Sequence, residues 1–142
     1  MILPDVNVLV YAFNEDAQDH DRYAAWLKEA LAAPEPYAIS ELVLSAVVRI
    51  VTNPRILERP APLERALEFA EAVIAAPNCV RLAPGPRHWS IFTTLCRTAR
   101  ARGGAVTDAY FAALAIETGS EWITADRGFV RFPGLRWRHP LA

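Results

Sequence analysis

A chain of 142 residues with 53% hydrophobic residues is long enough and apolar enough to close one hydrophobic core, which excludes a disordered polypeptide. No apolar run reaches the roughly 18 residues that cross a bilayer, and the N-terminus lacks the pattern of a secretory signal peptide. We therefore expect a cytoplasmic protein without a membrane segment. Cys79 and Cys96 have neither zinc-ligand nor disulfide-framework spacing and are expected to be free thiols.

The formal net charge of -1 conceals an uneven distribution of charges. Residues 1–80 carry 6 Lys+Arg against 12 Asp+Glu, whereas residues 81–142 carry 9 Arg against 4 Asp+Glu. The pattern indicates a molecule with two electrostatic faces, although the charges could equally mix once the chain folds. Because the planar guanidinium binds phosphate in a bidentate manner, a polyanion is one candidate partner for the second half.

The chain alternates short strand signals with longer helical ones. The expected strands are Ile2–Pro4, Tyr37–Ile39, Cys79–Leu82, Trp122–Thr124 and Leu135–Arg138. Apolar residues at helical spacing predict helices around residues 23–31, 63–74 and 89–99, and the Pro and Gly residues fall between these elements. The Val-rich segment Ser40–Thr52 is ambiguous, but its length, a Ser40 N-cap and the stop at Pro54 favour a helix.

A further helix is expected from Asp108 to Glu117, with Thr107 as its N-cap and Gly119 as its C-terminal stop. It is apolar nearly all round, so we expect it to be central. Alternating strands and helices predict an α/β fold: a single domain over residues 1–142 with a mainly parallel central sheet of about five strands flanked by helices.

Three aspartates occupy positions at which parallel α/β proteins bind ligands. Asp5 follows the first strand, Asp108 begins the apolar helix, and Asp126 follows the fourth strand. The carboxyl ends of parallel strands share one edge with the starts of the following helices. Three carboxylates at that edge repel one another unless a cation lies between them, and their oxygen atoms suit Mg²⁺ or Mn²⁺. Taken singly, Asp108 could instead favour a helix dipole and Asp126 a turn.

Several ordered motifs now resemble those of the PIN-domain ribonucleases, and specifically the VapC-type toxins of toxin–antitoxin systems. The motifs, which extend over essentially the whole chain, are Leu3-Pro4-Asp5-Val6-Asn7-Val8-Leu9, Val48-Arg49-Ile50-Val51-Thr52-Asn53-Pro54-Arg55, Pro84-Gly85-Pro86-Arg87-His88, Val106-Thr107-Asp108-Ala109-Tyr110, Thr124-Ala125-Asp126-Arg127-Gly128-Phe129 and Phe132-Pro133-Gly134-Leu135. Each motif alone is weakly specific, and the ordered set is strongly so.

The resemblance implies a Mg²⁺- or Mn²⁺-dependent endoribonuclease that is inhibited by a cognate VapB-type antitoxin and forms a homodimer. It implies that Asp5 and Asp108 are metal ligands and that Asp126 completes the catalytic acidic cluster. Asn7 matches a small polar residue that supports the first aspartate. The resemblance also implies that Val6–Tyr11 is helical despite its strand-like composition.

One position departs from the family pattern. PIN domains commonly carry a glutamate in the second helix where this chain has Ala46. The nearest acid, Glu41, lies five residues earlier and about 140° away around a helix axis, so it does not face the same way. Glu41 either reaches the site from the helix start or is an ordinary N-terminal helix charge.

The missing glutamate leaves a rival function open, a PIN-like RNA-binding module with weak or no nuclease activity. A metal-dependent phosphatase is a third possibility, but Asp5-Val6-Asn7 lacks the second aspartate of the common phosphatase motif. The four tryptophans are expected to lie in the core or in an interface rather than to stack on bases.

Overall fold

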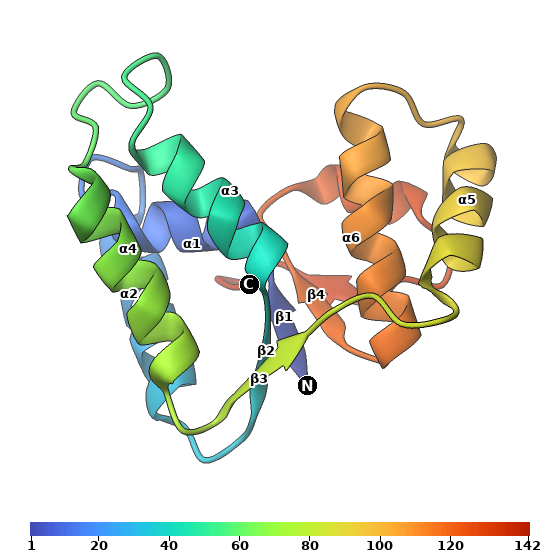
Figure 1. Cartoon of the computed structure of the whole chain (residues 1–142), viewed down its shortest axis with the longest axis horizontal. Coiled ribbons are helices and arrows are strands. Elements are labelled where there is room, and N and C mark those ends of the chain that lie inside the picture. Colours follow the sequence, from blue (N-terminus) through green and yellow to red (C-terminus); the bar gives the residue numbers. More distant parts are fainter.

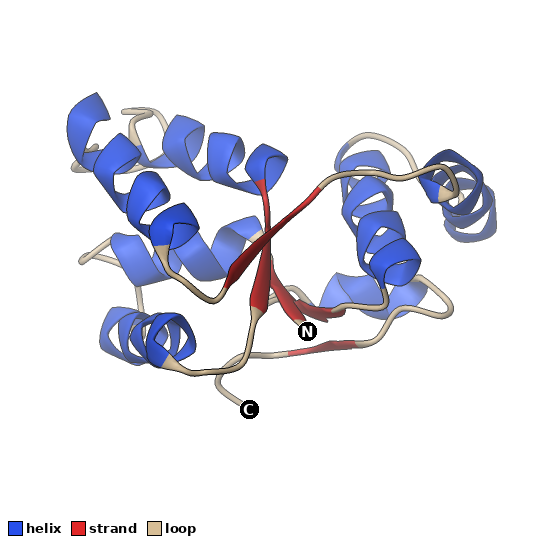
Figure 2. Ribbon diagram, turned by 60° about the horizontal axis from the view of Figure 1, so that its bottom comes forward, coloured by secondary structure: helices blue, strands red, loops and turns tan.

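The apolar strand segments form one sheet in the computed structural model, which describes all residues, 1–142. Its strands are β1 (Ile2–Pro4), β2 (Tyr37–Ser40), β3 (Cys79–Leu82), β4 (Glu121–Ile123) and β5 (Trp137–Arg138). They lie in the order β3-β2-β1-β4-β5, and every neighbouring pair is parallel. The predicted α/β fold with a parallel sheet of about five strands is confirmed (Figure 2).

Helices pack on both faces of this sheet. They are α1 (Val6–Phe13), α2 (His20–Ala32), α3 (Glu41–Val51), α4 (Leu63–Ala75), α5 (His88–Ala99) and α6 (Gly104–Thr118), followed by the 3₁₀ helix η1 (Arg127–Arg131). Figure 1 shows α1 to α4 gathered on one side of the strands, and α5 beside α6 on the other. None of these helices combines the length and the apolar character that crossing a membrane requires.

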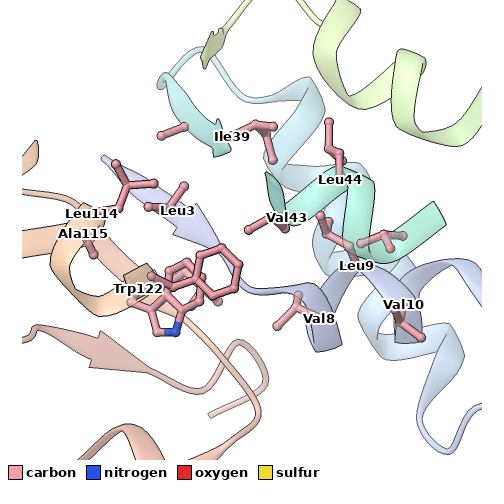
Figure 3. Packing of buried hydrophobic residues seen from close by; sticks show 14 of the residues in the cluster. Leu3, Val8, Leu9, Val10, Ile39, Val43, Leu44, Leu114, Ala115 and Trp122 are labelled. Atoms are coloured by element: carbon pink, nitrogen blue, oxygen red, sulfur yellow. The ribbon is translucent and has the colours of Figure 1, made fainter. Parts of the chain in front are cut away.

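The core lies between the sheet and both layers of helices. Leu3 of β1, Ile39 of β2 and Trp122 of β4 are completely buried (Figure 3). Phe111 of α6 stacks on Trp122 with ring centroids 5.5 Å apart. Because β1 is the middle strand and is apolar on both faces, it anchors the chain segment that follows it. That segment begins with Asp5.

The predicted start of one helix was wrong. Helix α6 begins at Gly104, so Thr107 lies within its first turn and is not the N-cap. Gly103 precedes the helix with a positive φ of 60°, a conformation that glycine adopts without strain, and this lets the helix start early. Ser40 does stand at the start of α3, but its side chain caps no backbone N–H. Gly119 ends α6 in the left-handed conformation, as predicted.

Candidate active site

Asp5 is held at the carboxyl end of the central strand. Its backbone N–H donates to the Ile123 carbonyl oxygen at 2.8 Å, which ties the end of β1 to β4. Its Oδ1 accepts a 2.6 Å hydrogen bond from the Val6 N–H, so Asp5 is the N-cap of α1. The cap explains how the Val-rich residues after Asp5 enter a helix rather than a strand. It leaves the second carboxylate oxygen for other partners.

That second oxygen belongs to a small polar network. The Thr124 hydroxyl donates to Asp5 Oδ2 at 2.7 Å, and the Asn7 side-chain amide donates to the same oxygen at 3.3 Å. Asn7 also bonds both Thr124 Oγ1 and the Ala125 N–H, and Thr124 Oγ1 accepts from the Asp126 N–H at 3.0 Å. The network therefore fixes the orientation of Asp5 and joins it to the loop that carries Asp126.

Asp108 and Asp126 reach the same edge from different elements. Asp108 lies in the second turn of α6, and its Oδ2 accepts a 2.6 Å hydrogen bond from Arg131 of η1. Asp126 caps η1, because its Oδ1 accepts from the Gly128 N–H at 2.8 Å. Its Oδ2 has no protein partner. Asp108 Oδ1 and Asp126 Oδ2 thus remain available for a cation or a water molecule.

The electrostatic environment of these groups favours a cation. Burial raises the pKa of Asp5 to about 6, against the opposing hydrogen bonds from Thr124 and Val6, and the charges of Asp108 and Asp126 raise it further. Burial also raises the pKa of Asp108, which the Arg131 charge partly offsets. A carboxylate that is desolvated and repelled by its neighbours is stabilised by any positive charge that enters.

A cavity of about 1220 Å³ opens in front of the aspartates. Asp5, Asp108 and Asp126 all line it, together with Asn7. Most of the remaining lining is apolar, so the carboxylates share the cavity mainly with hydrophobic side chains. Such concave sites with a few convergent polar groups are the usual places for ligands.

The opposite wall of the cavity comes from α3. Ala46 and Arg49 are among the lining residues, so the position at which we expected the family glutamate shares the cavity with the aspartates. Glu41 is not part of the lining. Its carboxylate lies 3.4 Å from the guanidinium of Arg81, and both side chains are more than half exposed. Among the acids considered from the sequence, Glu41 is the one that the structure does not bring to the cavity.

The oxygen donors at this edge, including those of Asp5 and Asp108, are of the kind that suits a hard divalent cation. The fit rests on oxygen donors only, on two raised pKa values and on mutual repulsion among the carboxylates. No three His, Cys, Asp or Glu side chains converge closely enough to hold an ion jointly. One oxygen of Asp108 is instead engaged by Arg131 of η1.

Two residues of the site were missed by sequence reasoning. Thr124 is completely buried and connects Asp5 to Asp126, and its place beside Asp126 in the quoted motif was the available signal. Arg131 lies 23 residues from Asp108 in the chain, and nothing in its spacing indicates the ion pair.

This arrangement of sheet, helices and carboxylates defines a family. The chain belongs to the PIN-domain family, whose model matches residues 2–135. Ribonuclease VapC43 of Mycobacterium tuberculosis is 43% identical over 141 residues, which cover 99% of this chain and 96% of the relative. Ribonuclease VapC25 of the same organism is 39% identical over 140 residues, 99% of both chains. Within the PIN-domain family the chain is therefore of the VapC type.

Solved structures agree with the fold. The VapBC2 complex of Rickettsia felis, bound to a promoter DNA fragment, matches with a TM-score of 0.69 and 20% identity over 98% of both chains. VapBC-1 of nontypeable Haemophilus influenzae matches with a TM-score of 0.68 and 15% identity over the whole of both chains. At these identities the likeness concerns the backbone architecture alone.

Proposed function

We propose that this chain is a Mg²⁺- or Mn²⁺-dependent endoribonuclease that acts in the cytoplasm as the toxin of a toxin–antitoxin pair. The observation that carries the proposal is Asp5, a nearly buried carboxylate with a raised pKa that shares one cavity with Asp108 and Asp126. Full-length similarity to proteins named VapC ribonucleases supports the choice of RNA as the substrate.

Each acidic residue has a distinct role in the proposed reaction. A divalent cation bound at this edge supplies positive charge for the scissile phosphate and lowers the pKa of a nearby water. Asp5 and Asp108 hold the cation, while Asn7 and Thr124 keep Asp5 oriented. Asp126, through its free Oδ2, helps to bind the cation or orients the attacking water.

The charge distribution supports a polyanionic substrate. Of the salt bridges in the structure, only Arg81–Glu41 joins residues 1–80 to residues 81–142; the others pair charges within one half. The excess of arginine in the second half is therefore not neutralised by the acidic first half. We assign Arg97 and Arg100, both exposed, to the RNA backbone. Their combined substitution by glutamine should lessen the salt dependence of RNA binding.

The proposed partners are a VapB-type antitoxin and a second copy of the chain. Exposed apolar side chains support an antitoxin contact at the cavity, because Leu42 and Ile56 line it while remaining 49% and 52% exposed. Apolar residues held at the surface around a charged site gain free energy when a partner covers them. Titration of cleavage with the purified antitoxin and sedimentation of the free chain test the two contacts separately.

The deciding experiment incubates purified protein with a structured RNA, with EDTA, Mg²⁺ or Mn²⁺. We expect internal cleavage that requires a cation and disappears in Asp5→Asn. Retention of RNA without cutting would favour the PIN-like binding module instead, in keeping with Ala46 at the glutamate position. Release of inorganic phosphate without chain cleavage would identify a phosphatase.

A further inference from the structure

The segment from residue 83 to residue 107 has an unusual charge composition. It contains Arg87, Arg97, Arg100 and Arg102, and no Asp or Glu. Arg97, Arg100 and Arg102 are exposed and take part in none of the salt bridges, whereas Arg87 donates to the backbone oxygen of Glu117. Helix α5 and the loop after it thus present cationic groups that no carboxylate of the chain neutralises.

A row of aromatic rings begins on the same helix. Trp89, expected from the sequence to be a core or interface residue, is 68% exposed. Its ring centroid lies 5.3 Å from that of Phe92, and Phe92 lies 5.8 Å from Tyr110 of α6. Phe92 and Tyr110 both line the cavity that contains Asp5. The rings therefore lead without interruption from the surface of α5 to the wall of the candidate active site.

A buried histidine, His88, contacts two members of this row of aromatic rings. The His88 ring stacks on Phe92 at 6.3 Å, and its Nε2 lies 2.9 Å from the Tyr110 carbonyl oxygen. These contacts connect Phe92 and Tyr110 to the buried His88. Trp89, at the outer end of the row, contributes little to the core and is free to contact a ligand.

We propose that Trp89 and Phe92 form a base-stacking site that receives an unpaired nucleotide of the RNA next to the cleavage position, while Arg97, Arg100 and Arg102 bind the adjoining phosphates. Aromatic side chains beside a cationic track are the combination that binds single-stranded nucleic acid, because each base offers a flat face to stack on. A base inside a duplex is already covered on both faces, so this site selects loops and single strands.

The inference rests on the proposed ribonuclease function, and its test measures binding separately from cleavage. The protein carries Asp5→Asn to prevent cutting, and the probes are a labelled RNA hairpin with an unpaired loop and a fully paired RNA duplex of equal length. Trp89→Ala should weaken hairpin binding about 10-fold and leave duplex binding unchanged. Trp89→Phe, which keeps a ring, should retain most of the affinity. Val130→Ala, a change at a 74% exposed apolar residue of η1, is the matched control and should have no effect.

A spectroscopic arm distinguishes stacking from a structural role. Hairpin RNA should quench the tryptophan fluorescence of the Asp5→Asn protein, and Trp89→Phe should remove that part of the quenching. Equal hairpin affinity in Trp89→Ala and the parent would overturn the inference. The inference would also be overturned if Trp89→Ala lost affinity and sedimentation showed that a changed monomer–dimer equilibrium fully explains the loss. Trp89 would then belong to a contact between two copies of the chain. If the unmutated protein does not cleave RNA but hairpin binding still depends on Trp89, the nuclease proposal is overturned and the stacking site stands.

Discussion

Arg131 donates a hydrogen bond to Asp108, with 2.6 Å between Nη2 and Oδ2, and this guanidinium stands where a cation bound by Asp108 would compete with it. Both side chains are only partly exposed, at 37% and 28%, so water screens the pair incompletely. The guanidinium also lies over the Phe132 ring, 5.0 Å from its centroid, which restricts its movement. Arg131 therefore provides positive charge to the acidic cluster from within the chain.

Replacing Arg131 by glutamine should tighten Mn²⁺ binding, because the cation no longer competes with a fixed positive charge. We expect a gain of up to about fivefold, the equivalent of about 1 kcal/mol for a partly exposed ion pair. Calorimetric titration at pH 8 keeps Asp108 ionised in both proteins. Arg138→Gln breaks a similar pair with Glu121 away from the cavity and should leave Mn²⁺ affinity unchanged. Weaker Mn²⁺ binding in Arg131→Gln would show that Arg131 supports the cation rather than competing with it.

The buried Asp5 predicts an unusual pH dependence of stability. Its pKa of about 6 in the folded protein lies above the ordinary value of 3.8, so the folded state binds the proton more tightly than the unfolded state does. In the absence of metal, the part of the free energy of unfolding that Asp5 contributes should therefore fall as pH rises from about 4 to 7. Between these pH values the loss of stability that is due to Asp5 should be about 3 kcal/mol.

Urea unfolding in EDTA, repeated across this pH range, measures the effect. Asp5→Asn should flatten the profile while preserving the fold, although Asp108 retains a smaller dependence of the same sign. Mn²⁺ should stabilise the parent at pH 7 and have much less effect on Asp5→Asn. Parallel profiles for the parent and Asp5→Asn would mean that Asp5 is better solvated than the structure shows.

Thr124→Val tests the residue that orients Asp5. The change removes a buried donor to Asp5 Oδ2 and the acceptor for the Asp126 N–H, so it should cost about 1–3 kcal/mol of stability. The hydrogen bond from Thr124 lowers the pKa of Asp5, and its loss should raise that pKa above about 6. The pH at which Mn²⁺ affinity is half lost should move upward accordingly. Thr118→Val, whose hydroxyl bonds Leu114 and Ser120 away from the cavity, should destabilise the protein without that pH shift.

Substitutions in α3 test whether Glu41 takes part in the site and whether a glutamate at residue 46 would bind the cation. Glu41→Gln should leave cleavage and metal affinity intact, since Glu41 pairs with Arg81 outside the cavity and that exposed pair contributes at most about 1 kcal/mol. Ala46→Glu should tighten Mn²⁺ binding, because residue 46 lines the same cavity as the aspartates and the change adds a carboxylate there. Ala46→Gln, of matching size and without charge, is the control. Equal Mn²⁺ affinity in the Glu and Gln variants would show that residue 46 does not reach the ion.

Sequence patterns predicted the parallel sheet because each strand is a short apolar run between helical segments, a local property. They also predicted that Asp5 and Asp126 lie at one edge, since Asp5 comes directly after the first strand and Asp126 comes shortly after the fourth. The helix after Asp5 was different: its composition, Val-Asn-Val-Leu-Val, favours a strand, and only family resemblance predicted a helix. The structure supplies the reason, the cap from Asp5 to the Val6 N–H.

What the sequence could not provide were contacts between distant segments. The Arg131–Asp108 bond, the direction of Glu41 and the exposure of Trp89 each depend on how helices pack, not on local periodicity. The start of α6 was misplaced because two successive glycines normally interrupt a helix, whereas here only Gly103 adopts the interrupting conformation.

The pairing of β1 with β4 has a consequence for synthesis. Residue 2 lies opposite residue 121, so the central strand finds this neighbour only after most of the chain exists. The Asp5 carboxylate likewise needs Thr124 for its hydrogen bond. Contacts this remote in sequence form late in folding, and a growing chain emerges from the ribosome N-terminus first. An unfinished polypeptide that still lacks Trp122 and Thr124 therefore cannot complete the edge of the sheet that holds Asp5.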